Sequence, residues 1–376
     1  MLPVFGLLLA QAITLAQAGV QRPPQFVIMA FDNCTEIERW QELTDFTTEM
    51  NADRDQLHFT FFVSGVNFIA DAVRNLYEGP RHRRGYSSIG FGGSSADVRK
   101  RVDFANDLRR KGHEIASHAV GHFNGGDWSA AEWDQEFSSF QNAVENVGIN
   151  NGFPDGIKMD LPASQMRGFR APYLASDAAL YPVLKAKGFR YDTSGENFSN
   201  AWPEKTDGIW RFNLALLRLH GSGKRLLSMD YNFFVEQSNG IEDAGRSQVF
   251  GDQMLETYLD YFNSNYEGNR APLHIGHHFT NFQGGAYDVA IKTFARRVCG
   301  LPEVRCTTYS ELADFLDEQT PEALAAYGRG DFDRLNAPRT SLARLALIIT
   351  TAFAPAASSW RLNTRPLKSG IPRVRK

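Results

Sequence analysis

The histidines of this 376-residue chain are unevenly distributed. Three of the nine lie within residues 113–122, and three lie within 274–278. His118 and His122 have the i, i+4 spacing that lets two imidazoles on a helical turn reach one metal ion. Such a pair also arises by chance, and a lone histidine is more often a structural residue. The spacing alone leaves a metal site and a purely structural role both open.

Other reactive side chains follow strand-like apolar runs. Asp32 and Asn33 end the first run, and Arg170, Tyr173 and His278 stand at the ends of later runs. In barrels of alternating strands and helices, the active site gathers at the carboxyl ends of the strands. Acid–base catalysis needs one group that accepts a proton and another that donates one. A carboxylate held in place by a guanidinium can accept the proton, and an imidazole can donate it.

The elements that must position these residues alternate regularly from Phe26 to about Leu316. Alternation of strands and helices implies parallel pairing with right-handed crossovers. About seven strand signals favour an α/β fold of the distorted (β/α) barrel type over an open sheet. The predicted strands cover 26–31, 58–63, 114–118, 167–173, 189–192, 273–278 and 306–309. The predicted helices cover 36–50, 96–111, 130–147, 177–187, 249–264 and 286–298.

The two ends of the chain differ from this body. Residues 1–18 predict a secretory signal peptide, and thus a protein secreted from the cell or held in its envelope; a buried first helix is the alternative. Residues 321–376 carry ten basic side chains against three acidic ones and predict a disordered basic tail. Such a tail could touch an anionic surface, although a plain extension is the simpler interpretation.

Composition excludes several classes of protein. The net charge of −3 gives no indication of nucleic-acid binding. No stretch has the 18 or more apolar residues typical of an integral membrane span; residues 341–357 come nearest. Cys299 and Cys306 are close enough in sequence to form a disulfide in an exported protein, with two buried thiols as the alternative.

Four motifs in this order resemble a known family. They are Ala30-Phe-Asp-Asn33, Ser117-His-Ala-Val-Gly-His122, Arg170-Ala-Pro-Tyr173 and Asn269-Arg-Ala-Pro-Leu-His-Ile-Gly-His-His278. The chain thus resembles the polysaccharide deacetylases with NodB homology, carbohydrate esterase family 4, and the last motif is most similar to the chitin deacetylase-like branch. The resemblance implies that residues 19–320 form the catalytic domain of a NodB-type barrel.

The resemblance also implies a metal site with a catalytic base beside it. Asp32 matches the base, and Arg170 matches the arginine that holds it. Asn33, His118 and His122 match the ligands of a divalent metal, Zn2+ in the first place and Co2+ in the second.

The remaining matches concern the substrate and the leaving group. His278 matches the general acid, and Tyr173 matches the residue whose backbone N–H faces the oxyanion. Asp192 matches the acid that pairs with the arginine. Trp202 is a match to the aromatic wall of the substrate groove, and Ile275 to the pocket for the acetyl methyl group.

These matches imply metal-dependent hydrolysis of N-acetyl groups from a chitin-like polysaccharide of N-acetylglucosamine, with release of acetate. Asn33 departs from the pattern, because most members of the family have an aspartate there. The alternative is therefore a catalytically impaired relative that binds the glycan. A serine hydrolase or a zincin protease is not indicated, since the sequence contains neither GxSxG nor HExxH.

Overall fold

The fold is built around the strand β1 (Gln25–Asn33), which is buried except at its last residue. An apolar strand of this kind has packing on both faces, as parallel sheets require. Ile28 and Ala30 belong to an inner core, whereas Met29 and Phe31 belong to the larger core beneath the helices. The alternation places Asp32 on the inner face, next in line after Ala30.

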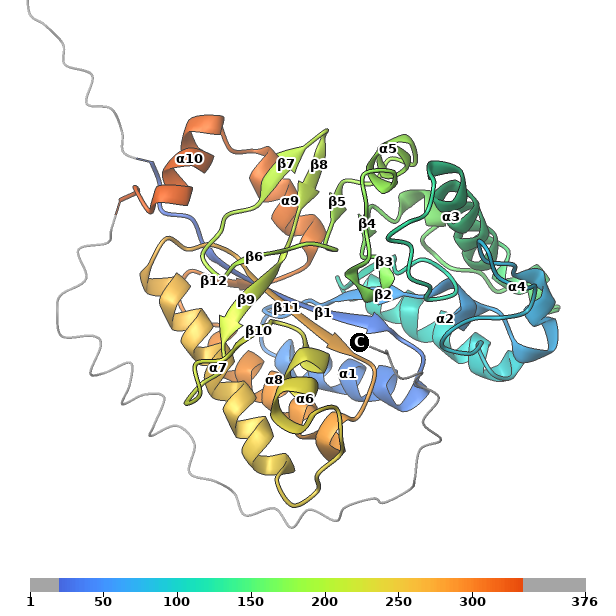
Figure 1. Cartoon of the computed structure of the whole chain (residues 1–376), viewed down its shortest axis with the longest axis horizontal. Coiled ribbons are helices and arrows are strands. Elements are labelled where there is room, and N and C mark those ends of the chain that lie inside the picture. Colours follow the sequence, from blue (N-terminus) through green and yellow to red (C-terminus); the bar gives the residue numbers. More distant parts are fainter. Residues whose placement is uncertain (1–19, 334–376) are drawn as a thin grey trace, which may run out of the picture.

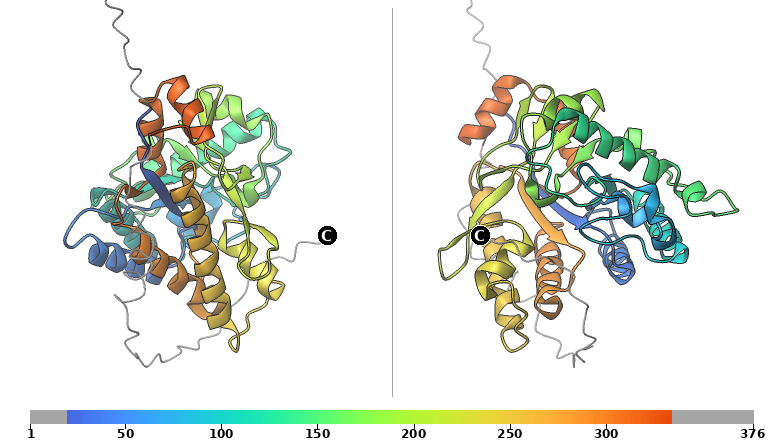
Figure 2. Two further views of the ribbon diagram at one scale, coloured as in Figure 1. Left: turned by 90° about the vertical axis from the view of Figure 1, so that its left-hand side faces the viewer. Right: turned by 45° about the vertical axis from the view of Figure 1, so that its right-hand side comes forward.

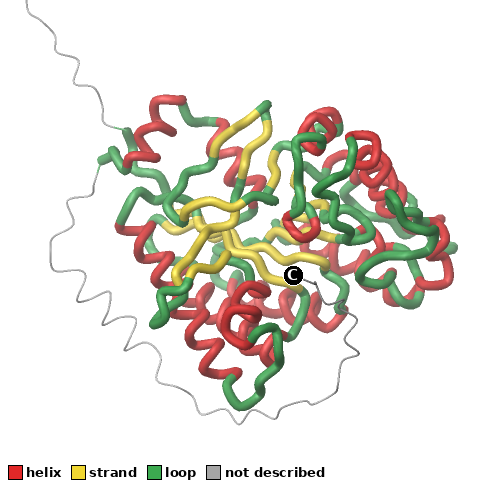
Figure 3. Tube along the Cα trace, viewed as in Figure 1, coloured by secondary structure: helices red, strands yellow, loops and turns green. Residues whose placement is uncertain are grey.

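The computed structural model describes residues 20–333 and contains a curled main sheet (Figures 1 and 3). The strands after β1 are β2 (Thr60–Val63), β3 (Glu114–Ser117), β4 (Gly168–Phe169), β5 (Tyr191–Asp192), β6 (Glu196–Phe198), β7 (Glu204–Thr206), β8 (Ile209–Arg211), β9 (Leu214–Arg218), β10 (Arg225–Leu227), β11 (Leu273–His278) and β12 (Val304–Cys306). The main sheet has nine strands in the order β11-β1-β2-β3-β4-β5-β8-β7, with β12 also paired to β1. Its pairs are parallel except β7 with β8. The predicted distorted barrel is confirmed.

Helices cover the outside of the curl, as the two views in Figure 2 show. They are α1 (Ile37–Met50), α2 (Ser95–Arg110), α3 (Ala130–Glu145), α4 (Val147–Asn150), α5 (Leu180–Ala186), α6 (Asp230–Ser238), α7 (Ser247–Glu267), α8 (Ala286–Val298), α9 (Tyr309–Asp317) and α10 (Pro321–Arg329). A small second sheet, in the order β10-β9-β6, is formed by strands that lie between β5 and α6 in the sequence.

The predicted boundary at residue 320 needs a correction. Helix α10 follows it, and Tyr327 of this helix is 3% exposed, with its ring 4.9 Å from that of Trp202. The ordered part of the chain therefore extends past the boundary, because an apolar side chain of α10 packs on the body. The predicted signal peptide and residues 334–376 of the predicted tail lie outside the described residues.

Two further features concern the cysteines and the membrane. Cys299 and Cys306 form a disulfide, whereas Cys34 is a buried free thiol. None of the helices within residues 20–333 has the length and apolarity needed to cross a bilayer.

Candidate active site

Strand register brings the predicted residues together at the carboxyl end of the sheet. Asp32 of β1 pairs with His278 of β11. Asn33 is in register with Val63 of β2, which in turn pairs with the residue just before His118. The row therefore joins the first, second and last of the four motifs, as the barrel geometry predicts.

Asp32 and Arg170 form a buried ion pair. The Arg170 Nη1 atom donates to Asp32 Oδ1 over 2.7 Å, and the two residues are 0% and 2% exposed. Arg170 also donates from Nε to Thr193 Oγ1 over 2.8 Å and from Nη2 to the Tyr309 hydroxyl over 3.3 Å. Burial lowers the pKa of Arg170, but the charge and hydrogen bond of Asp32, together with Tyr309 and Tyr191, outweigh it, so the net pKa is raised. The hydrogen bond from Arg170 fixes the direction of the Asp32 carboxyl group.

His118 and His122 face each other with ring centroids 5.1 Å apart. Two imidazoles bound to one tetrahedral ion, each about 2.0–2.1 Å from it, have centroids about 5 Å apart. His118 donates from Nδ1 to the backbone oxygen of Arg170 over 2.8 Å, which leaves Nε2 with its lone pair. Burial lowers the pKa of His118 to about 4 and that of His122 well below its ordinary value. Both rings are thus neutral at pH 7, the form that binds metals.

Asn33 is separated by one strand, β2, from the residue just before His118. Its Oδ1 atom and the Nδ1 atom of His122 are buried and have no hydrogen-bond partner. Within residues 20–333, no group of three or more His, Cys, Asp or Glu side chains is placed to hold a metal. The metal site expected from the sequence would therefore consist of the His118 and His122 imidazoles and the Asn33 amide.

His278 is held by an acid that the motifs did not indicate. Asp230, 1% exposed at the start of α6, accepts from His278 Nδ1 over 2.6 Å and from its backbone N–H over 2.8 Å. Burial lowers the pKa of His278, but the charge and hydrogen bond of Asp230, together with the charge of Asp32, outweigh it, so the net pKa is raised. The imidazole is thereby favoured in its protonated form. An acid that opens a helix was the one available signal for Asp230.

Tyr173 lies beside the imidazole pair. Its ring centroid is 4.8 Å from that of His122, and the residue is 52% exposed. Its backbone is left-handed, with φ 58° and ψ 11°. A non-glycine residue in this region costs free energy and often marks a functional site.

Asp192 does not have the expected partner. Its Oδ1 atom accepts from the Ser194 hydroxyl over 2.6 Å, and its Oδ2 atom lies 3.7 Å from Arg211. Among the described residues, Arg170 instead bonds to Asp32, Thr193 and Tyr309. The expected direct pair between Asp192 and Arg170 is thus not formed, because Ser194 and Arg211 lie closer to the carboxyl group.

Ile275 lies elsewhere than expected, because it belongs to the larger core beneath the helices, on the opposite face of β11 from His278. Trp202, predicted for the wall of the substrate groove, donates to the backbone oxygen of Asn269, which precedes β11, and packs near Tyr327. Its role in a substrate groove stays a prediction.

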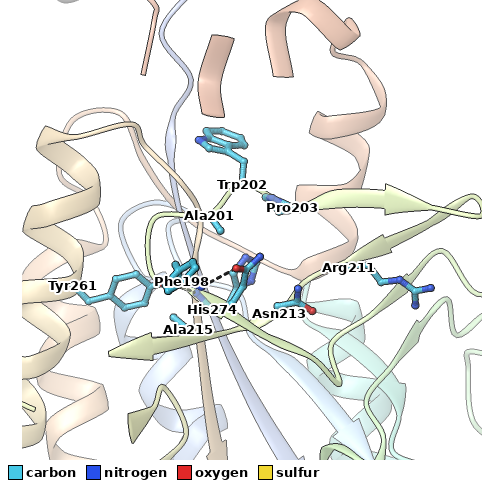
Figure 4. A pocket seen from close by; sticks show the side chains of 10 residues that line it. Phe198, Ala201, Trp202, Pro203, Arg211, Asn213, Ala215, Tyr261 and His274 are labelled. Carbon is cyan, nitrogen blue, oxygen red and sulfur yellow. Dashed lines mark hydrogen bonds between the residues drawn. The ribbon is translucent and has the colours of Figure 1, made fainter. Parts of the chain in front are cut away.

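Figure 4 shows the surroundings of Trp202. A cavity of about 10 Å³, the volume for one water, lies among Trp202, Phe198, Arg211 and His274. The Nδ1 atom of His274 is buried without a partner. The cavity is lined by none of the residues of the two ion pairs or of the imidazole pair.

Comparison with protein-family models identifies part of the chain. Residues 19–191 match the family model described as polysaccharide deacetylase. No curated protein matches the sequence significantly.

One solved structure, with a TM-score above 0.5, has the same fold, and two others are similar over a large part of their length. A polysaccharide deacetylase structure from Mycobacterium smegmatis is 16% identical, with a TM-score of 0.52, and the match covers 81% of this chain and 96% of the other. The polysaccharide deacetylase Bc1974 from Bacillus cereus is 12% identical, with a TM-score of 0.40 over 79% of this chain and 95% of the other. A family 4 pseudoenzyme from Bacillus anthracis is 11% identical, with a TM-score of 0.40 over 77% and 66%.

Proposed function

We propose, from the match of residues 19–191 to the polysaccharide deacetylase family model, that this protein hydrolyses N-acetyl groups of a chitin-like polysaccharide and releases acetate. The observation that carries the proposal is the arrangement of three buried groups in one row. The Asp32–Arg170 pair, the imidazoles of His118 and His122 and the His278–Asp230 pair occupy neighbouring strand ends.

The two ion pairs fit the proton transfers of amide hydrolysis. Asp32 is aimed by Arg170, and its carboxylate would accept a proton from an attacking water. The raised pKa of His278 favours its protonated form, which would donate a proton to the departing glucosamine nitrogen. The backbone N–H of Tyr173 is proposed to stabilise the oxyanion of the tetrahedral intermediate.

His118, His122 and Asn33 are proposed to hold a divalent metal, Zn2+ or, alternatively, Co2+. When bound, such an ion polarises the acetyl carbonyl and lowers the pKa of a water. The unpartnered Oδ1 of Asn33 and Nδ1 of His122 support the proposal, because buried polar atoms rarely lack a partner.

Asn33 also favours the second candidate, a catalytically impaired relative that binds the glycan. An amide brings no negative charge to the ion, so affinity for the metal should be lower than with a carboxylate. The two candidates share the fold and the substrate, and they differ in turnover.

The proposed setting is outside the cell or in its envelope. The apolar N-terminal residues and the disulfide between Cys299 and Cys306 support export. The proposed partner is an N-acetylated cell-wall or matrix glycan.

Acetate release tests the proposal. Purified protein is stripped of metal with a chelator, given Zn2+ or Co2+, and incubated with chitin oligomers; His118→Ala is the matched control. Metal-dependent acetate from the unaltered chain supports the proposal. Glycan binding without acetate would favour the second candidate, and acetate from O-acetylated xylan alone would show that the bond is an ester.

A further inference from the structure

The segment 118–122, here called the ligand loop, has a costly backbone. Ala119 and His122 are left-handed, with φ of 56° and 54°, although neither is glycine. Each such residue costs about 1–3 kcal/mol and persists only where its surroundings enforce it. The direction of the two imidazoles therefore depends on the groups that hold the loop.

The middle of the ligand loop is held by one carboxylate. Glu136 Oε1 accepts from the backbone N–H of Val120 over 2.9 Å and from that of Gly121 over 3.1 Å. These two amides stand between the two imidazoles in the sequence. Because one oxygen binds consecutive amides, it fixes the orientation of both peptide planes.

Glu136 is itself held rigidly in the core. It is 0% exposed on α3, and the hydroxyl of Tyr77 donates toward its two oxygens over 3.0 and 2.8 Å. A Cβ at Gly121 would lie 2.5 Å from that hydroxyl, so the loop and Tyr77 are in close contact. Burying a carboxyl group is expensive, and the two loop amides and the Tyr77 hydroxyl offset part of that cost.

Backbone contacts fix the rest of the loop. Gly65 N–H donates to the Ala119 oxygen over 2.9 Å, and Ser88 N–H donates to the Gly121 oxygen over 2.9 Å. Both contacts join backbone atoms, so a change of the side chain at position 136 does not remove them directly. A substitution there therefore removes one defined support of the loop.

We propose that Glu136 is a positioning residue that orients His118 and His122 for a shared metal ion, acting through the amides of Val120 and Gly121. The inference rests on the proposed function, since it presumes that the two imidazoles bind a metal. In this proposal, the carboxylate of Glu136 determines the relative orientation of the His118 and His122 imidazoles. The carboxylate contacts neither ring and binds only the backbone between them.

The test measures Zn2+ affinity by competition with a chromophoric chelator, together with the visible spectrum of the Co2+ form. Glu136→Met keeps the length of the side chain and removes both acceptors. We expect it to weaken metal binding about 10–100-fold, as loss of outer supports does at metal sites. Glu136→Gln keeps one acceptor oxygen for the two amides and should bind nearly as tightly as the unaltered chain.

Glu114 offers a matched control. It also accepts from a tyrosine hydroxyl, that of Tyr191 over 2.8 Å, and from the N–H of Ser310 over 3.0 Å, but it contacts no part of the ligand loop. Glu114→Met should lower the free energy of unfolding and leave the metal affinity of the folded protein unchanged.

The outcomes separate this inference from the proposed function. If the unaltered chain binds no Zn2+, the proposed function fails and the inference fails with it. If the unaltered chain binds Zn2+ and folded Glu136→Met binds it equally well, the inference alone is overturned, as it is if Glu114→Met loses as much affinity. Should Glu136→Met not fold, Glu136→Asp takes its place, because it keeps the charge and withdraws the oxygens from the amides; unchanged affinity there would equally refute the inference.

Discussion

Replacing Asp32 by asparagine separates the role of the base from every other role in the site. The change keeps the shape of the side chain and an oxygen for Arg170, and it removes only the charge and the basicity. Loss of a positioned general base costs about 10²–10⁴-fold in turnover. We therefore expect Asp32→Asn to lose nearly all acetate release while it still binds the metal.

The cost in stability follows from the ion pair. Opposite charges 2.7 Å apart attract by about 6 kcal/mol at an effective dielectric constant of 20. A hydrogen bond to the charged Arg170 that the amide retains returns about 1.5–3 kcal/mol. The free energy of unfolding should thus fall by about 3–4 kcal/mol, in line with other broken buried pairs.

Three measurements check this prediction: acetate release with saturating metal, unfolding in denaturant and metal affinity by chelator competition. Asp192→Asn is the control, since Asp192 is also buried at a strand end but bonds to Ser194. It should turn over substrate like the unaltered chain. Retention of more than about a tenth of the turnover by Asp32→Asn would refute its assignment as the base, and loss of turnover in Asp192→Asn would restore the role that the sequence suggested for Asp192.

Three further predictions follow from the described contacts. Asp230→Asn should lower the pKa of His278, so the alkaline limb of the kcat–pH profile moves to lower pH; an unmoved limb would mean that another group donates the proton. Asn33→Asp should tighten Zn2+ binding, measured by chelator competition, because a carboxylate brings charge to the ion; equal affinity would show that Asn33 is no ligand. A chain ending at residue 320 should unfold about 3–5 kcal/mol more easily than one ending at 333, since Trp202 loses its aromatic neighbour on α10; equal stability would show that this packing contributes little.

Sequence reasoning succeeded where the signal was local. The apolar run of β1 and the polar residues after it predicted both the strand and its end, because parallel strands buried on both faces need such runs. The residues now seen in the row, Asp32, Asn33, His118 and His278, all stood at such ends.

Other parts of the fold and of the site depend on tertiary contacts that no local sequence pattern predicts. The strands β6–β10 have three to five residues, and β7 is exposed along its length, so no period marks them. Asp230 follows this segment and reaches His278 only after the chain has passed through α6 and α7. A partner at that distance in sequence is decided by tertiary packing.

Two errors could have been avoided from the sequence. Alternation along β11 puts Ile275 on the face opposite His278, whichever face is inner. Helix α10 carries a start signal, Thr320 before Pro321, and a stop at Gly330, where φ is 68°. The start and stop signals of α10 were outweighed by the basic charge counted over the whole of 321–376. Most of that basic charge lies beyond the helix.

Asp32 and His278, the proposed base and acid, each bond to a partner of their own. Asp32 and His278 are register neighbours, and a carboxyl group and an imidazole so placed could bond to each other. In residues 20–333, Arg170 Nη1 donates to Asp32 Oδ1, and His278 Nδ1 donates to Asp230 Oδ1 instead. Each contact leaves the second polar atom of the side chain, Asp32 Oδ2 or His278 Nε2, available. In the proposed mechanism, the two pairs thus keep the base and the acid from bonding to each other and leave these two atoms for the substrate.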